Sequence, residues 1–360
     1  RSTAYSPHHA MAKKKKTLPK DFTELLAAND LNTLKAALSQ CEPNAYDRYA
    51  FNKPALSFYD IPVELMAWLL EQGADINVKD EYGRTPLHYH AQVNNTAQLA
   101  FLLAQGADIH AQDTYGNTPL HFAEYHADAA RLLIEHGADI KAKGDRRHDV
   151  VERMLSRLSS GEIARAAQAA AVYLQAGYKP TKLAKEQVVR IGEDFEFHRA
   201  GFNPEFLAKT EAGLQQLYRL FAVPPVPKRI QHDGQSPIML AGDTWEQRYE
   251  QALVLLVPGS GQAGTMQGEA VRIAGKINDE LLRNAMGNWD KEYRKMLTAL
   301  GGYLQQGNAL SASQLAEVAH ISKHMLEDDG TGSSRLCELA TLWVCRNPEP
   351  IALEKPTYRY

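Results

Sequence analysis

The stretch Asp80–Ala91, DEYGRTPLHYHA, recurs almost unchanged at Asp113–Ala123 as DTYGNTPLHFA, and the two copies start 113 − 80 = 33 residues apart. A second shared element follows each copy: LLAQGADIHAQD begins at Leu102 and LLIEHGADIKAKG at Leu132, and an earlier LLEQGADINVKD begins at Leu69. Self-similarity at a fixed period of this length is typical of a solenoid, in which each repeat is one supersecondary unit stacked on the next.

Each Thr-Pro pair in the motif predicts the start of a helix. The hydroxyls of Thr85 and Thr118 would accept hydrogen bonds from the first free N–H groups of that helix. Pro86 and Pro119 then occupy the first helical position, where no N–H is needed.

Thr-Pro-Leu-His-x-Ala at a period of 33 resembles the ankyrin repeat. The resemblance implies that Leu87 and Leu120 enter the core between repeats. It also implies that His88 and His121 form hydrogen bonds between neighbouring loops. We therefore interpret both histidines as structural residues and not as catalytic ones.

The repeats extend on both sides of the two clear copies. The segment from Asn52 carries Lys-Pro-Ala-Leu in place of the motif, and the segment from Phe22 has the spacing of a helix pair without it. We interpret them as a second repeat and an atypical capping repeat. Val151–Pro180 has the pattern of a degenerate fifth repeat, and atypical terminal repeats are expected in a solenoid.

Proline and hydrophobic periodicity predict the remaining organisation. The three prolines within Phe221–Lys228 exclude a helix there and mark a domain boundary. Helical periodicity returns afterwards, and no strand is predicted anywhere. The fold class is therefore all-α: an ankyrin-repeat solenoid followed by a compact α-helical domain. The expected parts are a vector remnant with a disordered basic N-terminus (1–19), the array of four to five repeats (20–180), a helical connector (181–221), a Pro-rich linker (222–237), the C-terminal helical domain (238–346) and an irregular tail (347–360).

Composition agrees with an ordinary soluble protein, since 44% of the 360 residues are hydrophobic and 23% are charged. No apolar run approaches the roughly 20 residues of a membrane span, and we expect no membrane partner. The residues before Met11 resemble an expression-vector remnant, and no secretory signal follows them. The three cysteines are too few and too scattered for a disulfide framework or a zinc site. We expect a cytoplasmic protein without a metal or cofactor.

Charge is distributed unevenly along the chain. Residues 20–144 contain nine Lys and Arg against seventeen Asp and Glu, giving 9 − 17 = −8, whereas residues 145–360 contain 26 of each sign. An acidic array would attract a basic partner and make association sensitive to salt. It argues against direct nucleic-acid binding, which requires a basic surface.

Two features of the C-terminal region suggest chemistry. Gly259–Gly264 has the spacing G-x-G-x-x-G, but no second strand follows that would complete a dinucleotide-binding unit, so we interpret it as a structural loop. Gln267, Glu269, Arg272 and Asp290 concentrate polar groups beside apolar ones. We interpret this cluster as a hydrogen-bond network that holds helices together; acid/base catalysis is the alternative.

A pair of histidines provides a weaker signal. His320 and His324 share one helical face with Glu317, but they lack a third ligand in a recognised metal-binding context. We interpret them as ordinary surface or core histidines, and we predict no metal site.

The candidate binding surface follows from the ankyrin resemblance. Ankyrin-repeat proteins bind other proteins through their β-turn tips and the first helices that line a concave groove. Aromatic side chains in such positions supply contact area at low entropic cost. The corresponding partner-binding residues here are Tyr59, Asp80, Glu81, Tyr82, Tyr89, His90, Asp113, Tyr115, Phe122 and Tyr125.

These observations predict a non-enzymatic protein that binds a protein partner. The chain resembles bacterial cytoplasmic immunity proteins, which neutralise a cognate toxin, so the partner would be a basic toxin or effector whose active or substrate-binding surface is occluded. The alternative is that the C-terminal helical domain acts as an enzyme or effector and that the repeats recruit its target. A host-directed effector with the same ankyrin adaptor is a third possibility.

Overall fold

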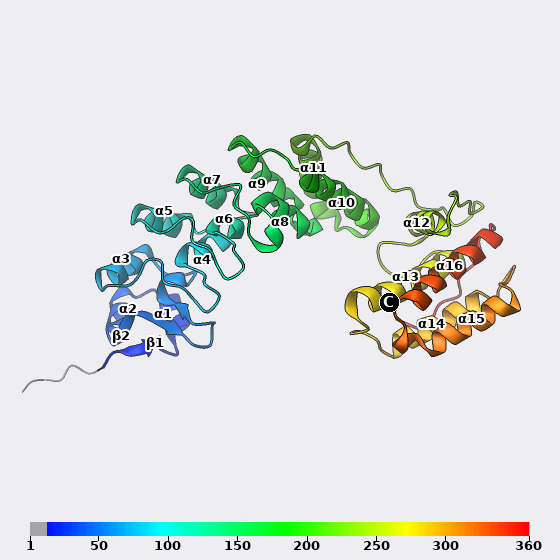
Figure 1. Ribbon diagram of the computed structural model, residues 1–360, viewed down its shortest axis with the longest axis horizontal. Helices are drawn as coiled ribbons and strands as arrows, with labels where there is room; N and C mark the ends of the chain where they lie inside the picture. The colour runs from blue at the N-terminus through cyan, green and yellow to red at the C-terminus, as the bar shows by residue number, and fades with distance from the viewer. Residues whose placement is uncertain (1–12, 360) are drawn as a thin grey trace, which may run out of the picture. The chain divides into compact units, whose positions relative to one another are not determined.

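The computed structural model describes residues 13–359 (Figure 1). The residues interpreted as a vector remnant lie outside this range. The chain divides into two compact units, each made of two segments. The first unit contains the chain up to Gly192 together with Glu205–Pro225, and the second contains Glu193–Pro204 together with the chain from Val226 onward. The domain bounds inferred from the sequence remain a prediction.

The first unit begins with a small sheet that the sequence did not predict. Strands β1 (Lys15–Thr17) and β2 (Cys41–Asp47) are parallel, and β2 is antiparallel to β3 (Lys53–Pro54). The expectation of a disordered N-terminus is therefore wrong for Lys15–Thr17, and the sequence contains no clear signal for these three short strands. The strands of two and three residues are too short to show an alternating pattern. β1 pairs with residues 41 − 15 = 26 and 46 − 17 = 29 positions away.

Helices stacked in pairs form the rest of this unit, although α10 (Lys182–His198) continues past Gly192 into the second unit. Figure 1 shows α3, α5 and α7 in one row and α4, α6 and α8 in another. Consecutive pairs contact each other, α4 with α6 and α5 with α7. The helices are α1 (Phe22–Ala28), α2 (Leu31–Leu38), α3 (Val63–Glu71), α4 (Pro86–Gln92), α5 (Thr96–Ala104), α6 (Pro119–Phe122), α7 (Ala127–Glu135), α8 (Val150–Ser156), α9 (Ile163–Gln175), α10 (Lys182–His198) and α11 (Pro204–Phe221).

The Thr-Pro-Leu-His motif starts α4 and connects it to the next repeat. The backbone N–H of Thr85 donates to Nδ1 of His88 at 3.0 Å, so Nδ1 is an acceptor. The other nitrogen, Nε2, must then carry the proton, and it lies 3.0 Å from the carbonyl oxygen of Asn117 in the following repeat. His121 repeats this arrangement toward the carbonyl of His148. One imidazole thus caps a helix and joins two repeats.

The second unit is a bundle around one central helix. α13 (Met266–Asn284) contacts α12 (Trp245–Leu256), α14 (Lys291–Tyr303) and α16 (Thr331–Arg346), and α15 (Ala312–Lys323) packs on α14 and α16. The core includes the fully buried Trp343. Within the described chain the fold is mostly helical, as predicted.

The segment after α16 contains no helix but is fixed to the bundle. Gln267 donates from Nε2 to the carbonyls of Asn347 and Glu349, at 2.9 and 2.7 Å, and its Oε1 accepts from the N–H of Ile351. Ala352 also forms an isolated antiparallel bridge with Thr265. The tail is therefore part of the packed unit.

Close packing of α9 against α11 gives a first prediction. A Cβ at Gly213 would lie 2.7 Å from Cα of Ala164, which is backbone and cannot move aside. We expect Gly213→Ala to lower the free energy of unfolding by about 1 kcal/mol or more, because the overpacking cost exceeds the helix-propensity gain of alanine. Urea unfolding followed by circular dichroism measures this. Gly161→Ala is the control, since a Cβ there has no atom within 4 Å; equal stability of the two variants would contradict the close approach.

The buried histidines give a second prediction. Burial lowers the pKa of His88 and of His90 to about 4 in each case. The folded state therefore stays neutral while the unfolded state takes up protons below its ordinary histidine pKa of about 6.5, so stability is present above that pH and is lost as the pH falls toward 4. We expect each histidine to cost about 2 kcal/mol of unfolding free energy at about pH 5 relative to about pH 7.

Urea unfolding at the two pH values tests this expectation. His90→Gln should show a smaller loss of stability on acidification than the unsubstituted chain. His136→Gln is the control, because His136 is exposed at the end of α7. An unchanged pH dependence in His90→Gln would show that this buried imidazole does not link protonation to folding.

Candidate functional site

A cavity of about 340 Å³ lies in the first unit, where the loops and helices of neighbouring repeats meet. It combines cationic, aromatic and acidic side chains. We call it the repeat pocket, and its lining is Arg84, Gln92, Asp113, Tyr115, Asn117, Phe122, Glu124, Asp145, Arg153 and Arg157.

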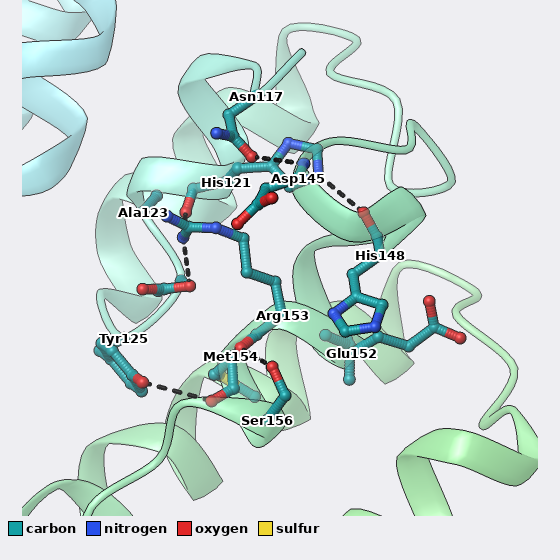
Figure 2. Close-up of polar contacts among 12 residues, drawn as sticks. Asn117, His121, Ala123, Tyr125, Asp145, His148, Glu152, Arg153, Met154 and Ser156 are labelled. Carbon is teal, nitrogen blue, oxygen red and sulfur yellow. Dashed lines mark hydrogen bonds and ion pairs between the residues drawn. The ribbon is translucent and has the colours of Figure 1, made fainter. Parts of the chain in front are cut away.

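Arg153 lines the repeat pocket, and Figure 2 shows its hydrogen bonds. Its Nη1 donates to the carbonyl of His121 at 2.8 Å and to a carboxylate oxygen of Glu124. The two side chains are only 11% and 13% exposed. Burial raises the pKa of the Glu124 carboxyl, and the positive charges of Arg153 and Arg157 oppose this rise. This ion pair joins α8 to the preceding repeat and fixes the guanidinium at the pocket.

Arg84 has no comparable carboxylate. Its guanidinium carbon lies 5.2 Å from the Tyr82 ring centroid and 5.3 Å from that of Phe122, and its Nε is buried without a hydrogen-bond partner. Within residues 13–359 no acidic side chain is within ion-pair distance of Arg84 or Arg157. Aromatic faces stabilise a cation, so Arg84 needs no carboxylate partner inside the fold. The repeat pocket therefore combines cations with the carboxylates of Asp113, Glu124 and Asp145.

The predicted partner-binding residues fall into three groups of exposure. Glu81, Tyr115 and Tyr59 are exposed, Tyr115 at 57% and Tyr59 at 37%. Tyr82, Phe122 and Tyr125 are half-buried. Asp80, Tyr89, His90 and Asp113 are buried, so the expectation that these four offer contact surface is wrong.

Turn geometry explains why the two aspartates are buried. One carboxylate oxygen of Asp80 accepts from the N–H groups of Tyr82 and Arg84, each at 2.8 Å, and the other accepts from the hydroxyl of Tyr89 at 2.6 Å. Asp113 accepts in the same way from its own turn. These carboxylates satisfy backbone donors at the repeat tips, which is a common role of Asp in turns.

His90 and Tyr59 are held by internal contacts. His90 is fully buried, with Nε2 2.9 Å from the carbonyl of Leu56. The Lys53 ammonium lies 3.9 Å from the ring centroid of Tyr59 and 4.4 Å from that of Tyr89. Burial lowers the pKa of Lys53 to about 8. This part of the aromatic surface is thus already occupied by a cation of the chain itself.

Sequence reasoning missed Arg84, Arg153 and Arg157. Arg84 occupies the position of the motif at which the next copy has Asn117, and such differences between otherwise identical repeats were the available signal. Arg153 lies in α8 (Val150–Ser156) and Arg157 directly follows it, in a part of the chain that lacks the Thr-Pro-Leu-His motif. Only the structure shows that these three arginines line the same pocket.

The polar cluster of the second unit is saturated with internal hydrogen bonds. Glu269 is fully buried and accepts from Arg272 Nε and Nη2 at 2.9 and 2.7 Å, from the N–H of Ala263 at 2.9 Å and from the hydroxyl of Tyr358 at 2.7 Å. Asp290 caps α14 through the N–H groups of Glu292 and Tyr293. These contacts hold helices and tail together and leave no carboxylate oxygen of Glu269 without a donor.

The remaining motifs also have structural contacts. The carbonyl of Gly259 lies 3.1 Å from His198 Nδ1, and a Cβ at Gly259 would lie 2.9 Å from the carbonyl oxygen of Phe197. This glycine is needed for close packing. Glu317 pairs with Arg335. Among the described residues, no three His, Cys, Asp or Glu side chains are grouped to hold a metal ion.

The helices of residues 13–359 include none with the length and apolarity required to cross a membrane. No curated protein matches the chain. Residues 55–144 match the family model described as ankyrin repeats in three copies. This range contains the Thr-Pro-Leu-His motifs and the stacked helix pairs, so this part of the chain is an array of ankyrin repeats.

Proposed function

We propose that this chain is a non-enzymatic binding protein that captures a basic protein and neutralises it by occlusion, as bacterial cytoplasmic immunity proteins do with a cognate toxin. Ankyrin repeats imply a protein-binding role. The finer assignment rests on the surface of the repeats.

The observation that carries the proposal is the set of exposed acids on the array. Many carboxylates of this region are exposed to solvent, and those of Asp75, Asp108 and Asp139 also accept from the backbone N–H two residues later. A surface of one sign accelerates association with a partner of the opposite sign and makes it sensitive to salt. The exposed acids of residues 20–144 are Asp21, Glu24, Asp30, Asp60, Glu64, Glu71, Asp75, Glu81, Asp108, Asp128, Glu135 and Asp139.

Exposed aromatic rings at the repeat tips supply contact area. Tyr115 lines the repeat pocket and is 57% exposed. Tyr82 stands at the same motif position one repeat earlier and contacts Phe51 at 5.1 Å between ring centroids. Tyr is enriched among the few residues that supply most of the binding energy of an interface. A partner held on these tips would have its active or substrate-binding surface covered.

The alternative assigns the activity to the C-terminal helical unit as an enzyme or effector. It has less support, because Glu269 is fully satisfied by internal donors and Asp290 acts as a helix cap. Catalytic carboxylates need an approach for substrate and a pKa matched to proton transfer. The fully buried Glu269 offers no such approach.

The first experiment is affinity capture with the full chain from the lysate of its source organism, identified by mass spectrometry. One stoichiometric basic protein, released as salt rises, would support the proposal. A captured enzyme should also lose activity when the chain is added. A partner that is acidic, or whose activity is unchanged when bound, would contradict neutralisation of a basic protein.

The tip tyrosines give a third prediction. We expect Tyr82→Ala combined with Tyr115→Ala to weaken the complex by about 2 kcal/mol or more, because both rings lose buried contact area. Isothermal titration calorimetry with the captured partner measures the change. Phe206→Ala is the control, since Phe206 is 54% exposed on α11, away from the repeat tips. Unchanged affinity in the tyrosine variant, with unfolding unaffected, would remove the tips from the interface.

A further inference from the structure

The second unit contains a larger cavity, of about 670 Å³, between α14 and α15. This volume lies within the range of about 300–1,000 Å³ that is typical of small-molecule sites. We call it the α14–α15 groove. It is lined by Trp289, Arg294, Leu297, Thr298, Gly301, Gly302, Gln305, Leu315, Val318, Ala319, Ser322, Lys323, Met325 and Leu326.

The floor of the groove is apolar. Leu297, Val318 and Met325 are 5%, 3% and 1% exposed and belong to the core of the unit. The two hydroxyls in the lining are used within their own helices: Thr298 donates to the carbonyl of Arg294 at 2.9 Å, and Ser322 donates to that of Val318 at 2.7 Å. Most of the groove therefore presents carbon atoms to a ligand.

Two consecutive glycines open the groove on the α14 side. A Cβ at Gly301 or Gly302 would have no atom within 4 Å, whereas a Cβ at Gly268 or Gly275 of α13 would lie 2.7 or 2.4 Å from another group. Glycine inside a helix costs about 1 kcal/mol relative to alanine. Packing within the described chain explains Gly268 and Gly275 but not the pair in α14. Their missing side chains let a ligand lie against the helix backbone.

The charges of the groove gather at one end. α14 and α15 are consecutive helices, joined by residues 304–311, and they pack side by side (Figure 1). Connections of about 2–8 residues are usual between consecutive helices of a bundle, and such short connections join antiparallel neighbours. Arg294, early in α14, and Lys323, at the end of α15, therefore lie at the same end, as do Trp289 and Leu326.

Both cations are available to a ligand. Arg294 and Lys323 are exposed, and within the described residues neither forms an ion pair. No carboxylate lines the groove. An apolar trough with two cations at one end is complementary to a molecule with an apolar body and one anionic end.

We propose that the α14–α15 groove binds a small anionic amphiphile, an unbranched acyl chain with a terminal carboxylate. The acyl chain of the ligand lies over Leu297 and Val318 and against the helix backbone at Gly301 and Gly302. Its carboxylate lies between Arg294 and Lys323. An acidic amphipathic helix would need cations along its whole length, whereas the groove has them at one end. This site is separate from the repeats and does not depend on the function proposed for them.

The test is isothermal titration calorimetry of the full chain with dodecanoate, below its micelle concentration. Dodecyltrimethylammonium, with the same chain and a cationic head, is the matched ligand. We expect saturable one-to-one binding of dodecanoate that is at least about tenfold tighter than that of dodecyltrimethylammonium, which corresponds to about 1.4 kcal/mol. Absence of dodecanoate binding, or equal affinity for the two ligands, would overturn the proposal.

Substitutions then locate the bound molecule. Gly301→Leu fills the groove, and its Cβ meets no atom of the fold; we expect a loss of affinity of about tenfold or more. Arg294→Gln with Lys323→Gln should weaken dodecanoate about tenfold and leave dodecyltrimethylammonium unchanged. Lys291→Gln is the control, since Lys291 is exposed on α14 but outside the groove.

Two other outcomes would contradict the proposal, either by locating the bound amphiphile elsewhere or by assigning the groove another role. Full dodecanoate affinity in both Gly301→Leu and the double Gln variant would show that the amphiphile binds elsewhere. The unsubstituted protein could instead fail to bind dodecanoate and elute as a dimer in size-exclusion chromatography, with Gly301→Leu eluting as a monomer. That result would identify the groove as an interface between two copies of the protein. Circular dichroism of each variant excludes unfolding as the cause.

Discussion

The hydrogen bond from a neutral imidazole to the next repeat is the contact on which the array depends. In His88, one ring nitrogen accepts from the N–H of Thr85 and the other donates to the carbonyl of Asn117. Because the ring is buried, an unpaired nitrogen would be costly. Only one tautomer satisfies both partners, and it exists only while the ring is neutral. The position of one proton, on Nε2 of His88, therefore determines both the hydrogen bond at the helix start and the hydrogen bond to the next repeat.

The proposed binding surface lies on these repeats and carries charges of both signs in different places. Exposed carboxylates lie on tips and helices, while the repeat pocket contains Arg84 and Arg157, which have no carboxylate partner within the described chain. A basic partner that also offers a carboxylate or carbonyl oxygen would satisfy both regions. Complementarity of this kind distinguishes partners better than net charge alone, because a wrong juxtaposition of like charges is costly.

The sequence predicted the parts of the fold that local rules determine. Thr85 and Pro86 start a helix by capping chemistry that needs no tertiary contact, and the period of the motif implied the stack. It could not predict β1, whose three residues pair with Cys41–Asp47 far along the chain. Nor could it predict that Asp80 is buried, since the same turn chemistry is compatible with an exposed carboxylate. The repeat pocket was missed because Arg153 lies in α8, where the sequence has no Thr-Pro-Leu-His motif to align it with the repeats.

The anchoring of the tail determines when the second unit can fold. Tyr358 donates to Glu269 across 89 residues, and the Gln267 side chain binds backbone more than 80 residues later. During synthesis, domains fold in order from the N-terminus. Each repeat needs only its neighbours and can pack as it emerges from the ribosome. The buried charge of Glu269, by contrast, lacks one of its donors until Tyr358 has been made, so the helical unit completes its core after translation of the array has ended.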